Sequence, residues 1–316
     1  MLKYDVLCIG SATLDNFLTV DTSLKKIKLG DKILVSSIEK HSGGGATNAA
    51  AALSKLKLNV KILSKLGSDH DAEFILNELK GYKIRNICLH HSRKNTDFST
   101  LISSQKDRDR TIYVHKGASA DLTESDFKYS QLNTKWIYLA SLMGKSFQTA
   151  KKIVEFAQKK NIKLLFNPSL YLAKKGKHFL KPILTATDIL VLNKKEARTL
   201  LNIKSNSIKD ILLGLFELGP NTIIITQGPR RVYAYHLDKI YLAIPPKVKV
   251  VHTAGAGDAF TATVLAGLIK NKSFEHCLKM GLVNSTSVVQ YFGTKNKLLN
   301  ETEIELTIKK LKPKVK

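Results

Sequence analysis

The sequence predicts an α/β protein with a central, mostly parallel sheet that helices cover on both faces. From Trp136 to Thr226, short apolar runs alternate with helical patterns, as in sheets whose strands are joined by crossover helices. A continuous apolar run at Tyr4–Ile9, ended by Gly10, is typical of a buried parallel strand. The 316 residues, 43% of them hydrophobic, can bury such a core. We therefore expect a single α/β domain over residues 1–316.

Two stretches interrupt the alternation of strands and helices. Residues Phe17–Lys40 alternate in polarity, which favours short antiparallel strands over a crossover helix. Phe98–Ser103 and Arg110–His115, joined by a polar turn, have the pattern of a β-hairpin. We expect these segments, at about 13–40 and 97–117, to form a small projecting sheet, a lid that can close over a substrate.

The remaining segments follow in order along the chain. We expect strands at 60–66, 84–89, 136–140, 162–167, 188–193 and 222–226, and helices at 49–56, 72–79, 147–160, 176–184, 196–201, 208–218, 261–269 and 274–292. Asp69 is placed to cap the second of these helices. The lysine-rich end from Lys309 to Lys316 is expected to fray.

Composition excludes several classes of protein. The N-terminus is too soon interrupted by polar residues for a signal peptide, and no apolar run reaches membrane-spanning length, so we expect a cytoplasmic protein. Cys8, Cys88 and Cys277 are widely spaced and odd in number, which indicates neither a disulfide framework nor a zinc site. The net charge of +25 is spread along the chain without interleaved aromatic residues, so a lysine-rich composition explains it at least as well as nucleic-acid binding.

The stretch Gly255-Ala256-Gly257-Asp258 opens an apolar helical segment. Its glycines allow a ligand to approach the backbone, and the unpaired N–H groups of a helix start favour an anion such as a phosphoryl group. Asp258 lies among these donors. Because acidic residues also cap helices, the aspartate by itself fits either a cap or a functional carboxylate.

Four further motifs place polar groups at strand ends or helix starts. Asp15 follows the first strand, where it could receive ligand hydroxyls or simply stabilise a turn. A second glycine-rich loop, from Ser42 to Asn48, leads into an alanine-rich helix. In Asn193-x-x-Glu196, the glutamate could orient water on a phosphate-bound cation or stabilise its own helix. Thr226-Gln227-Gly228 ends another apolar strand.

Taken together, these motifs resemble the ribokinase-like (PfkB) family of carbohydrate and nucleoside kinases along nearly the whole chain. Asp15, the Gly43–Asn48 loop, Asn193-x-x-Glu196 and Gly255–Asp258 agree with that family in order and spacing. The last motif is the most specific. The resemblance implies the ribokinase-like fold and a kinase activity.

The resemblance also implies roles for individual residues. Asp258 would take the proton from an acceptor hydroxyl, and the backbone of Gly255, Ala256 and Gly257 would form the anion hole for the transferring phosphoryl group. Other implied roles are acceptor binding by Asp15, Gly44 and Asn48, phosphate binding by Asn193, magnesium binding through water by Glu196, and lining of the nucleotide side by Thr226, Gly228 and Asn284.

Three positions depart from the family pattern. Many relatives have an acidic residue at the position of His252, where it helps to bind a monovalent cation, so potassium activation is left open. Many ribokinases have a glutamate near Ser141, so ribose is not assured as the substrate. Arg231 stands where a glycine is common in the turn after Gly228.

The resemblance implies transfer of the γ-phosphate of ATP, with Mg²⁺, to a primary hydroxyl of a small sugar. A nucleoside kinase on the same scaffold is the alternative, and ADP as the donor stays open. A more distant alternative is a non-catalytic basic binding protein. We expect a small-molecule sugar or nucleoside as the partner, with no nucleic acid or membrane, and a homodimer formed through the lid.

Overall fold

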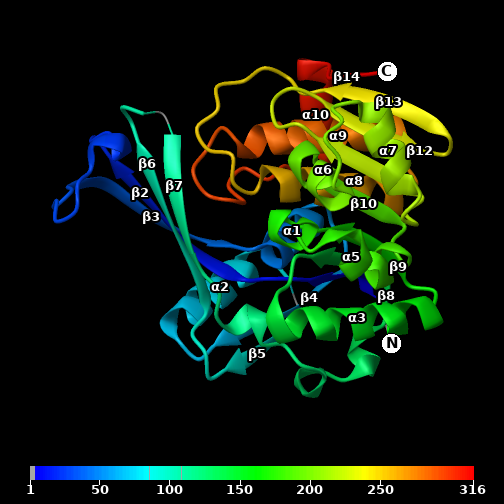
Figure 1. Cartoon of the computed structure of the whole chain (residues 1–316), viewed down its shortest axis with the longest axis horizontal. Coiled ribbons are helices and arrows are strands. Elements are labelled where there is room, and N and C mark those ends of the chain that lie inside the picture. The colour runs from blue at the N-terminus through cyan, green and yellow to red at the C-terminus, as the bar shows by residue number, and fades with distance from the viewer. Residues whose placement is uncertain (1–3, 85, 108) are drawn as a thin grey trace.

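The computed structural model describes residues 4–84, 86–107 and 109–316, and within these it leaves the side chains of residues 86–91 undescribed. The described chain forms a ten-stranded sheet and a four-stranded sheet (Figure 1). The order of the large sheet is β14-β13-β12-β11-β10-β9-β8-β1-β4-β5, parallel from β5 to β11 and antiparallel beyond. Its strands are β1 (Tyr4–Ile9), β4 (Val60–Gly67), β5 (Asn86–Ser92), β8 (Thr134–Ala140), β9 (Lys163–Asn167), β10 (Ile189–Asn193), β11 (Thr222–Thr226), β12 (Val232–His236), β13 (Lys239–Ile244) and β14 (Lys314–Val315).

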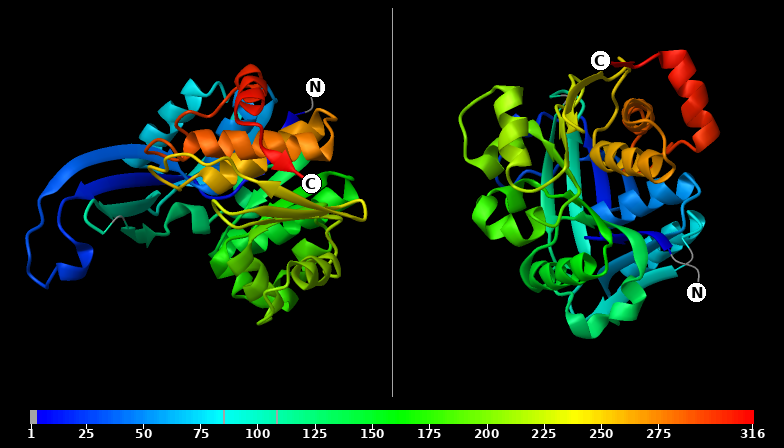
Figure 2. Two further views of the ribbon diagram at one scale, coloured as in Figure 1. Left: turned by 90° about the horizontal axis from the view of Figure 1, so that it is seen from above. Right: turned by 90° about the vertical axis from the view of Figure 1, so that its right-hand side faces the viewer.

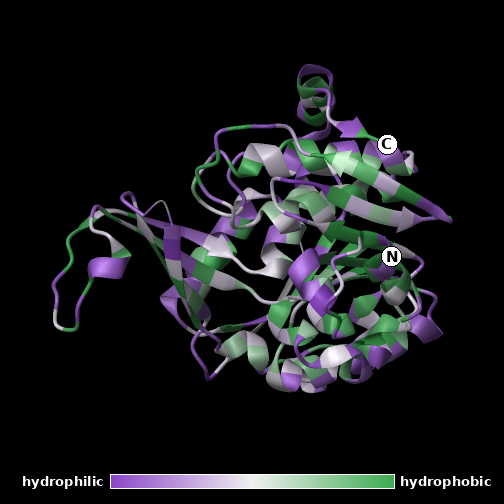
Figure 3. Cartoon of the chain, turned by 45° about the horizontal axis from the view of Figure 1, so that its top comes forward, coloured by the Kyte–Doolittle hydropathy of each residue, from purple (hydrophilic) through white to green (hydrophobic). Residues whose placement is uncertain are grey.

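Helices cover both faces of this sheet, as the sequence predicts (Figure 2). One face carries α1 (Gly45–Lys55), α2 (His70–Gly81), α8 (Ala256–Ile269), α9 (Phe274–Val288) and α10 (Glu301–Leu311), whose buried residues form one core cluster. The other face carries α3 (Gly144–Lys159), α4 (Leu170–Ala173), α5 (Gly176–Leu184), α6 (Lys194–Leu201) and α7 (Ile208–Phe216), which form a second cluster. The strands between them are therefore buried on both sides and are predominantly apolar (Figure 3).

The four-stranded sheet projects from the body as the predicted lid (Figure 1). It consists of β3 (Val35–Gly43), β2 (Thr13–Val20), β6 (Asp97–Ser104) and β7 (Asp109–His115), in that order. The β2–β3 and β6–β7 pairs are antiparallel, as expected, whereas β2 and β6 are parallel. Short 3-10 turns, η1 (Leu24–Lys26), η2 (Ala118–Ala120), η3 (Glu124–Asp126) and η4 (Tyr129–Leu132), complete the described elements.

Most predicted elements are confirmed, and the differences lie at sheet edges and helix ends. The strand expected at 84–89 runs instead from Asn86 to Ser92, and the side chain of Cys88 lies outside the described part. The helix expected to reach Phe292 ends at Val288. The C-terminal lysines do not fray, because Ala243 of β13 pairs with Val315 of β14. In the described residues, no helix combines the length and the apolar composition needed to cross a membrane.

Candidate active site

Helix α8 begins at Gly255 in a conformation that only glycine adopts easily. Its φ is +77°, and a Cβ atom there would lie 2.0 Å from the carbonyl oxygen of Thr294. The first hydrogen bond of the helix runs from the N–H of Ala259 to the carbonyl of Gly255 at 2.8 Å. The preceding N–H groups therefore have no partner inside the helix, and Gly257 and Asp258 line a cavity at this point. The predicted helix start at Gly255 is therefore formed, with N–H groups that are unpaired inside the helix.

The Asp258 carboxylate is held by an amide from the second glycine-rich loop. Asn48 Nδ2 donates to Asp258 Oδ2 at 2.7 Å, although the two residues are 210 positions apart. Burial raises the pKa of Asp258 to about 6, the Asn48 bond and the charge of Lys295 oppose the rise, and the charge of Asp15 adds to it. A carboxylate with a pKa near the working pH is suited to accept a proton.

Asn48 is itself fixed from the other side. Its Oδ1 accepts from Thr294 Oγ1 at 2.9 Å and from the buried ammonium of Lys295 at 3.4 Å. Because the oxygen is occupied by donors, the Nδ2 group must face Asp258. The loop that precedes Asn48 turns at Gly44, whose φ of +97° and closeness to Ser11 exclude a side chain. Sequence analysis missed Thr294 and Lys295, which directly follow Gly293 and carry no local motif.

Asp15 lies in lid strand β2, not in a turn, and is 8% exposed. Ser99 Oγ of the neighbouring strand β6 donates to its Oδ1. Burial raises the pKa of Asp15, while Ser99 and the charges of Lys295, Lys116 and His41 oppose this. Asp15, Gly44 and Asn48 do not line the cavity of Asp258, and Asn48 reaches it through its bond to that carboxylate.

The cavity has a volume of about 330 Å³ and lies at the carboxyl ends of four parallel strands. Ala140, Asn167, Asn193 and Thr226 close β8, β9, β10 and β11, and all four line it together with Asp258. Ligands of open α/β sheets bind beyond these strand ends. The fold thus brings the helix-start carboxylate and the strand-end polar groups to one cavity.

Asn193 and Glu196 form a reciprocal capping box at the start of α6. The N–H of Asn193 donates to Glu196 Oε2 at 2.8 Å, and the N–H of Glu196 donates to Asn193 Oδ1 at 2.9 Å. Burial raises the pKa of Glu196, hydrogen bonds with Asn193 oppose this, and the charge of Asp258 adds to it. The helix-stabilising interpretation is thus realised, and Glu196 still lines the cavity beside Asp258.

Gly228 and Thr226 line an adjoining depression of about 290 Å³, which also contains Lys194, Lys195 and Arg230. Asn284 is not brought to either hollow. Its side chain is fully buried, its Nδ2 donates to Thr263 Oγ1 at 2.7 Å, and its Oδ1 accepts from the N–H of Leu299 at 3.0 Å. It therefore ties α9 to its surroundings, and the structure gives it no opening toward a nucleotide.

The lid contacts the loop before Gly255 at two points. Arg110 of β7 donates to Thr253 Oγ1 at 2.8 Å, and Phe17 of β2 meets the ring of His252 edge-on with centroids 4.8 Å apart. Burial, with smaller contributions from the charges of Arg110 and His41, lowers the pKa of His252 to about 4, so its ring is neutral near pH 7. The lid is therefore in direct contact with the loop that leads into α8.

Known proteins are similar to this chain over nearly its whole length. The sequence profile described as pfkB family carbohydrate kinase matches residues 3–301. A ribokinase of Staphylococcus aureus is 26% identical over 299 residues, with 91% of this chain and 94% of the relative covered. A nucleoside kinase of Methanocaldococcus jannaschii is 26% identical over 295 residues, with 93% of each covered.

Solved structures show the same fold. The crystal structure of the M. jannaschii nucleoside kinase, an archaeal member of the ribokinase family, has a TM-score of 0.81 at 25% identity and covers 97% of this chain and 98% of that one. The Arabidopsis thaliana ribokinase complexed with ribose and ATP has a TM-score of 0.83 at 19% identity and covers 98% and 99%, respectively. Since the family profile matches nearly the whole sequence, the chain belongs to the pfkB family of carbohydrate kinases.

Proposed function

We propose that this kinase transfers the γ-phosphoryl group of ATP to a primary hydroxyl of a small sugar. The observation that carries the proposal is the position of Asp258. Its carboxylate lies in the first turn of α8, in a cavity shared with Asn193, Glu196 and Thr226. Phosphoryl transfer needs positioning and charge stabilisation more than covalent help, and this arrangement offers both.

In the proposed reaction, Asp258 accepts the proton of the acceptor hydroxyl as its oxygen bonds to the γ-phosphorus. The bond from that phosphorus to the oxygen of the β-phosphate breaks, and ADP leaves. The free N–H groups of Ala256 and Gly257 would donate to the phosphoryl oxygens, where the helix dipole also favours negative charge. Asn48 holds the carboxylate through its 2.7 Å bond. Asn193 would donate to the donor phosphates.

The carboxylates fit a magnesium ion bound mainly through water. Mg²⁺ usually keeps several waters and takes one or two carboxylates together with substrate phosphates. Glu196 and Asp258 line the same cavity, and the charge of Asp258 acts on Glu196. Bound there, the ion would neutralise charge on the donor phosphates.

Asp258→Asn tests the proposed reaction. Nucleotide and acceptor binding, measured by titration calorimetry, should change little, because Asn can keep the contact with Asn48. Turnover should fall by about 10³-fold or more, within the range lost when a general base is removed. Normal turnover in this variant would refute the assignment.

The acceptor could instead be a nucleoside. The S. aureus relative is a ribokinase and the M. jannaschii relative is a nucleoside kinase, at the same 26% identity. A panel of sugars and nucleosides, each assayed with ATP and with ADP for nucleotide consumption, would separate these alternatives. The panel would be repeated with and without potassium, because His252 stands where many relatives have an acid.

The outer face of the lid supports a proposed homodimer. Ile38 and Tyr113 are 63% and 61% exposed, and strand register places both on the face opposite Phe17. Covering them would bury apolar area now in water. A monomeric mass in light scattering would contradict this.

We further propose a single domain over residues 1–316 and a cytoplasmic location. Titration of labelled RNA and DNA across salt concentrations would test the alternative of a basic binding protein.

A further inference from the structure

Lys116 places an ammonium group in the cavity that contains Asp258. The residue directly follows β7, and its side chain is 30% exposed. It lines the cavity together with Ser141 and Tyr171. The sequence alone did not indicate a role for it. A cation in a substrate cavity requires a partner or a reason to stay solvated.

Its ion pair with Asp97 does not use up this ammonium. Lys116 Nζ lies 3.1 Å from Asp97 Oδ2, and Asp97 is fully buried. The carboxylate also accepts from the N–H groups of Gly117 at 2.9 Å and Ser119 at 3.0 Å, and from the Ser119 hydroxyl. Three further donors thus stabilise Asp97. Within the described residues Asp97 is the one partner of Lys116, so two of its three N–H groups remain for a ligand.

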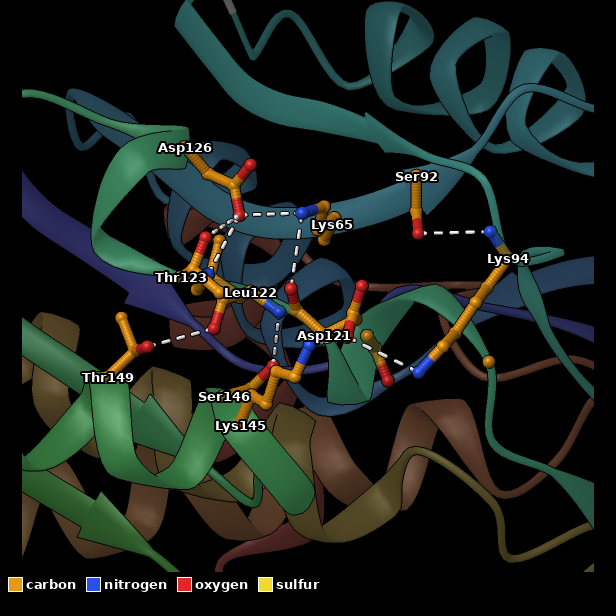
Figure 4. A network of polar contacts seen from close by, with 12 residues as sticks. Lys65, Ser92, Lys94, Asp121, Leu122, Thr123, Asp126, Lys145, Ser146 and Thr149 are labelled. Carbon is orange, nitrogen blue, oxygen red and sulfur yellow. Dashed lines mark hydrogen bonds and ion pairs between the residues drawn. The ribbon is translucent and has the colours of Figure 1, made fainter.

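Neighbouring lysines also pair with aspartates, but they lie outside the cavity. Lys65 Nζ donates to Asp126 at 2.7 Å and to the carbonyl of Asp121 at 3.1 Å, while Lys94 and Lys145 pair with the Asp121 carboxylate (Figure 4). None of the three lines the cavity. They hold the loop after the lid against β4 and α3, and they provide a matched comparison for Lys116.

The wall beside Lys116 consists of hydroxyl donors. Ser141 Oγ donates to Ser169 Oγ at 2.9 Å, and the N–H of Ser169 donates to Ser141 Oγ at 2.5 Å. Burial raises the pKa of Tyr171, while the neighbouring Ser141 and Ser169 oppose the rise, so its hydroxyl stays neutral. Hydroxyl groups around an ammonium are a suitable environment for the oxygens of a phosphate or carboxylate.

The ammonium belongs to the acceptor side of the cavity. Lys116 directly follows lid strand β7 and its partner Asp97 begins β6. Strand β6 pairs with β2, which carries Asp15, the residue of the lid assigned to the acceptor. The depression on the nucleotide side has cations of its own, Lys194, Lys195 and Arg230. A nucleotide therefore does not need Lys116.

We propose that Lys116 binds an anionic group on the acceptor, so that the preferred acceptor is a sugar carrying a phosphate or a carboxylate in addition to its reactive hydroxyl. This inference rests on the proposed kinase function and names its substrate class. The two sources of the anionic group have the same recognition chemistry, and the choice of acceptors distinguishes them.

The test compares matched neutral and anionic acceptors. For phosphate the pairs are fructose with fructose 6-phosphate and ribose with ribose 1-phosphate, and for carboxylate the pair is sorbitol with gluconate. We expect kcat/KM to favour the anionic member of at least one pair by about tenfold or more, the scale of one charge-assisted contact. Lys116→Met should abolish that preference, because it should lower kcat/KM far more for the anionic member than for the neutral one. Lys116→Arg should retain part of it.

Lys145→Met serves as the matched control, since Lys145 also pairs with an aspartate but lies outside the cavity, and it should behave as the unmodified protein. If Lys116→Met does not fold, Lys116→Met/Asp97→Asn removes the carboxylate left without its cation. The inference is overturned if neutral acceptors are preferred and Lys116→Met has no effect. It is also overturned if Lys116→Met slows all acceptors equally and raises KM for ATP, because the ammonium would then serve the transferring phosphoryl group.

Failure of the kinase function gives a different result. No acceptor would then be consumed, whereas calorimetric titration of the three anionic compounds into nucleotide-free protein still measures the anion site. Binding of one of them that weakens at least tenfold in Lys116→Met supports the site, and undetectable binding of all three contradicts it.

Discussion

Lys295→Met should weaken both the fold and the chemistry by removing one buried cation. The ammonium is 2% exposed and donates to the carbonyl of Ser42, and it lies 3.4 Å from Asn48 Oδ1 and 3.3 Å from Glu78 Oε1. Removing one partner of a buried ion pair costs about 3–5 kcal/mol. Because Glu78 is 24% exposed and water can take over part of its pairing, we expect a loss of about 2–3 kcal/mol in the free energy of unfolding, measured with urea.

The catalytic effect should be smaller but diagnostic. Asn48 keeps its 2.9 Å bond from Thr294, so its amide stays oriented, and we expect kcat to fall about tenfold or less, because one weak contact is lost. Lys295 lowers the pKa of Asp258 against the effect of burial. Without it that pKa rises, so kcat/KM should begin to fall at a higher pH as the solution is acidified. Lys295→Met leaves the other interacting groups in place. These are Asp15, whose charge acts on Asp258, and Glu196 and Tyr138, on which the charge of Asp258 acts.

Three variants make this experiment interpretable. Lys295→Arg keeps the charge and should keep the pH profile. Lys297→Met removes an exposed lysine from the same loop and should have no effect. Lys295→Met/Glu78→Gln should recover stability but not the pH profile, since it removes the stranded carboxylate without restoring the cation. An unchanged acidic limb in Lys295→Met would refute the electrostatic argument even if the protein were destabilised.

Three further predictions concern the same site. The pKa of Asp258 is about 6 in the folded protein and lower in the unfolded chain, so ionisation of this carboxyl destabilises the fold, and the cost is complete above pH 6. Asp258→Asn should therefore be about 1–2 kcal/mol more stable at pH 8, a value reduced to allow for solvent in the cavity. Thermal melts should show this advantage shrinking toward pH 4. Gly255→Ala should destabilise the protein by more than about 2 kcal/mol, because the residue has a positive φ and the new Cβ would clash with the Thr294 carbonyl. Gly257→Ala has open space for its Cβ, so it should keep the melting temperature, but the methyl group would enter the cavity and turnover should be lost. Glu196→Gln can keep the capping box, so stability should be unchanged while the Mg²⁺ concentration for half-maximal activity rises at least severalfold.

Elements with strong local signals could be predicted from the sequence alone. The bounds of β11 (Thr222–Thr226) and α5 (Gly176–Leu184) agree with expectation because each is an apolar pattern flanked by polar, Gly or Pro residues. The β12–β13 hairpin was missed, since Tyr233 and Tyr235 are only half-buried at the antiparallel side of the sheet. Strand β14 depends on Val315 meeting a residue some 70 positions away, which no local pattern encodes.

The candidate site divides in the same way. Asp258, Asn193, Glu196 and Thr226 were found because each stands at a strand end or a helix start, and the fold brings such positions together. Asn284 is a polar residue in a helix, and its burial against α8 could not be foreseen from its spacing. Lys116 and Lys295 could not be distinguished by sequence among 51 lysine and arginine residues, and only their contacts in the fold indicate a role in the site.

The charge state of Asp258 is set by segments that lie far apart in the chain. Burial by α8 raises its pKa, Asn48 of α1 and Lys295 of the 289–300 loop lower it, and Asp15 of the lid raises it. Because Asp15 belongs to lid strand β2, a lid movement that changes its distance from Asp258 also changes the basicity of that carboxylate. Displacing Asp15 from Asp258 would lower the pKa of the base, and an anionic acceptor bound at Lys116 would raise it. Acceptor binding and proton transfer are therefore coupled through electrostatics, so the acidic limb of kcat, which reports the complex with substrate, should lie at higher pH with an anionic acceptor than with a neutral one.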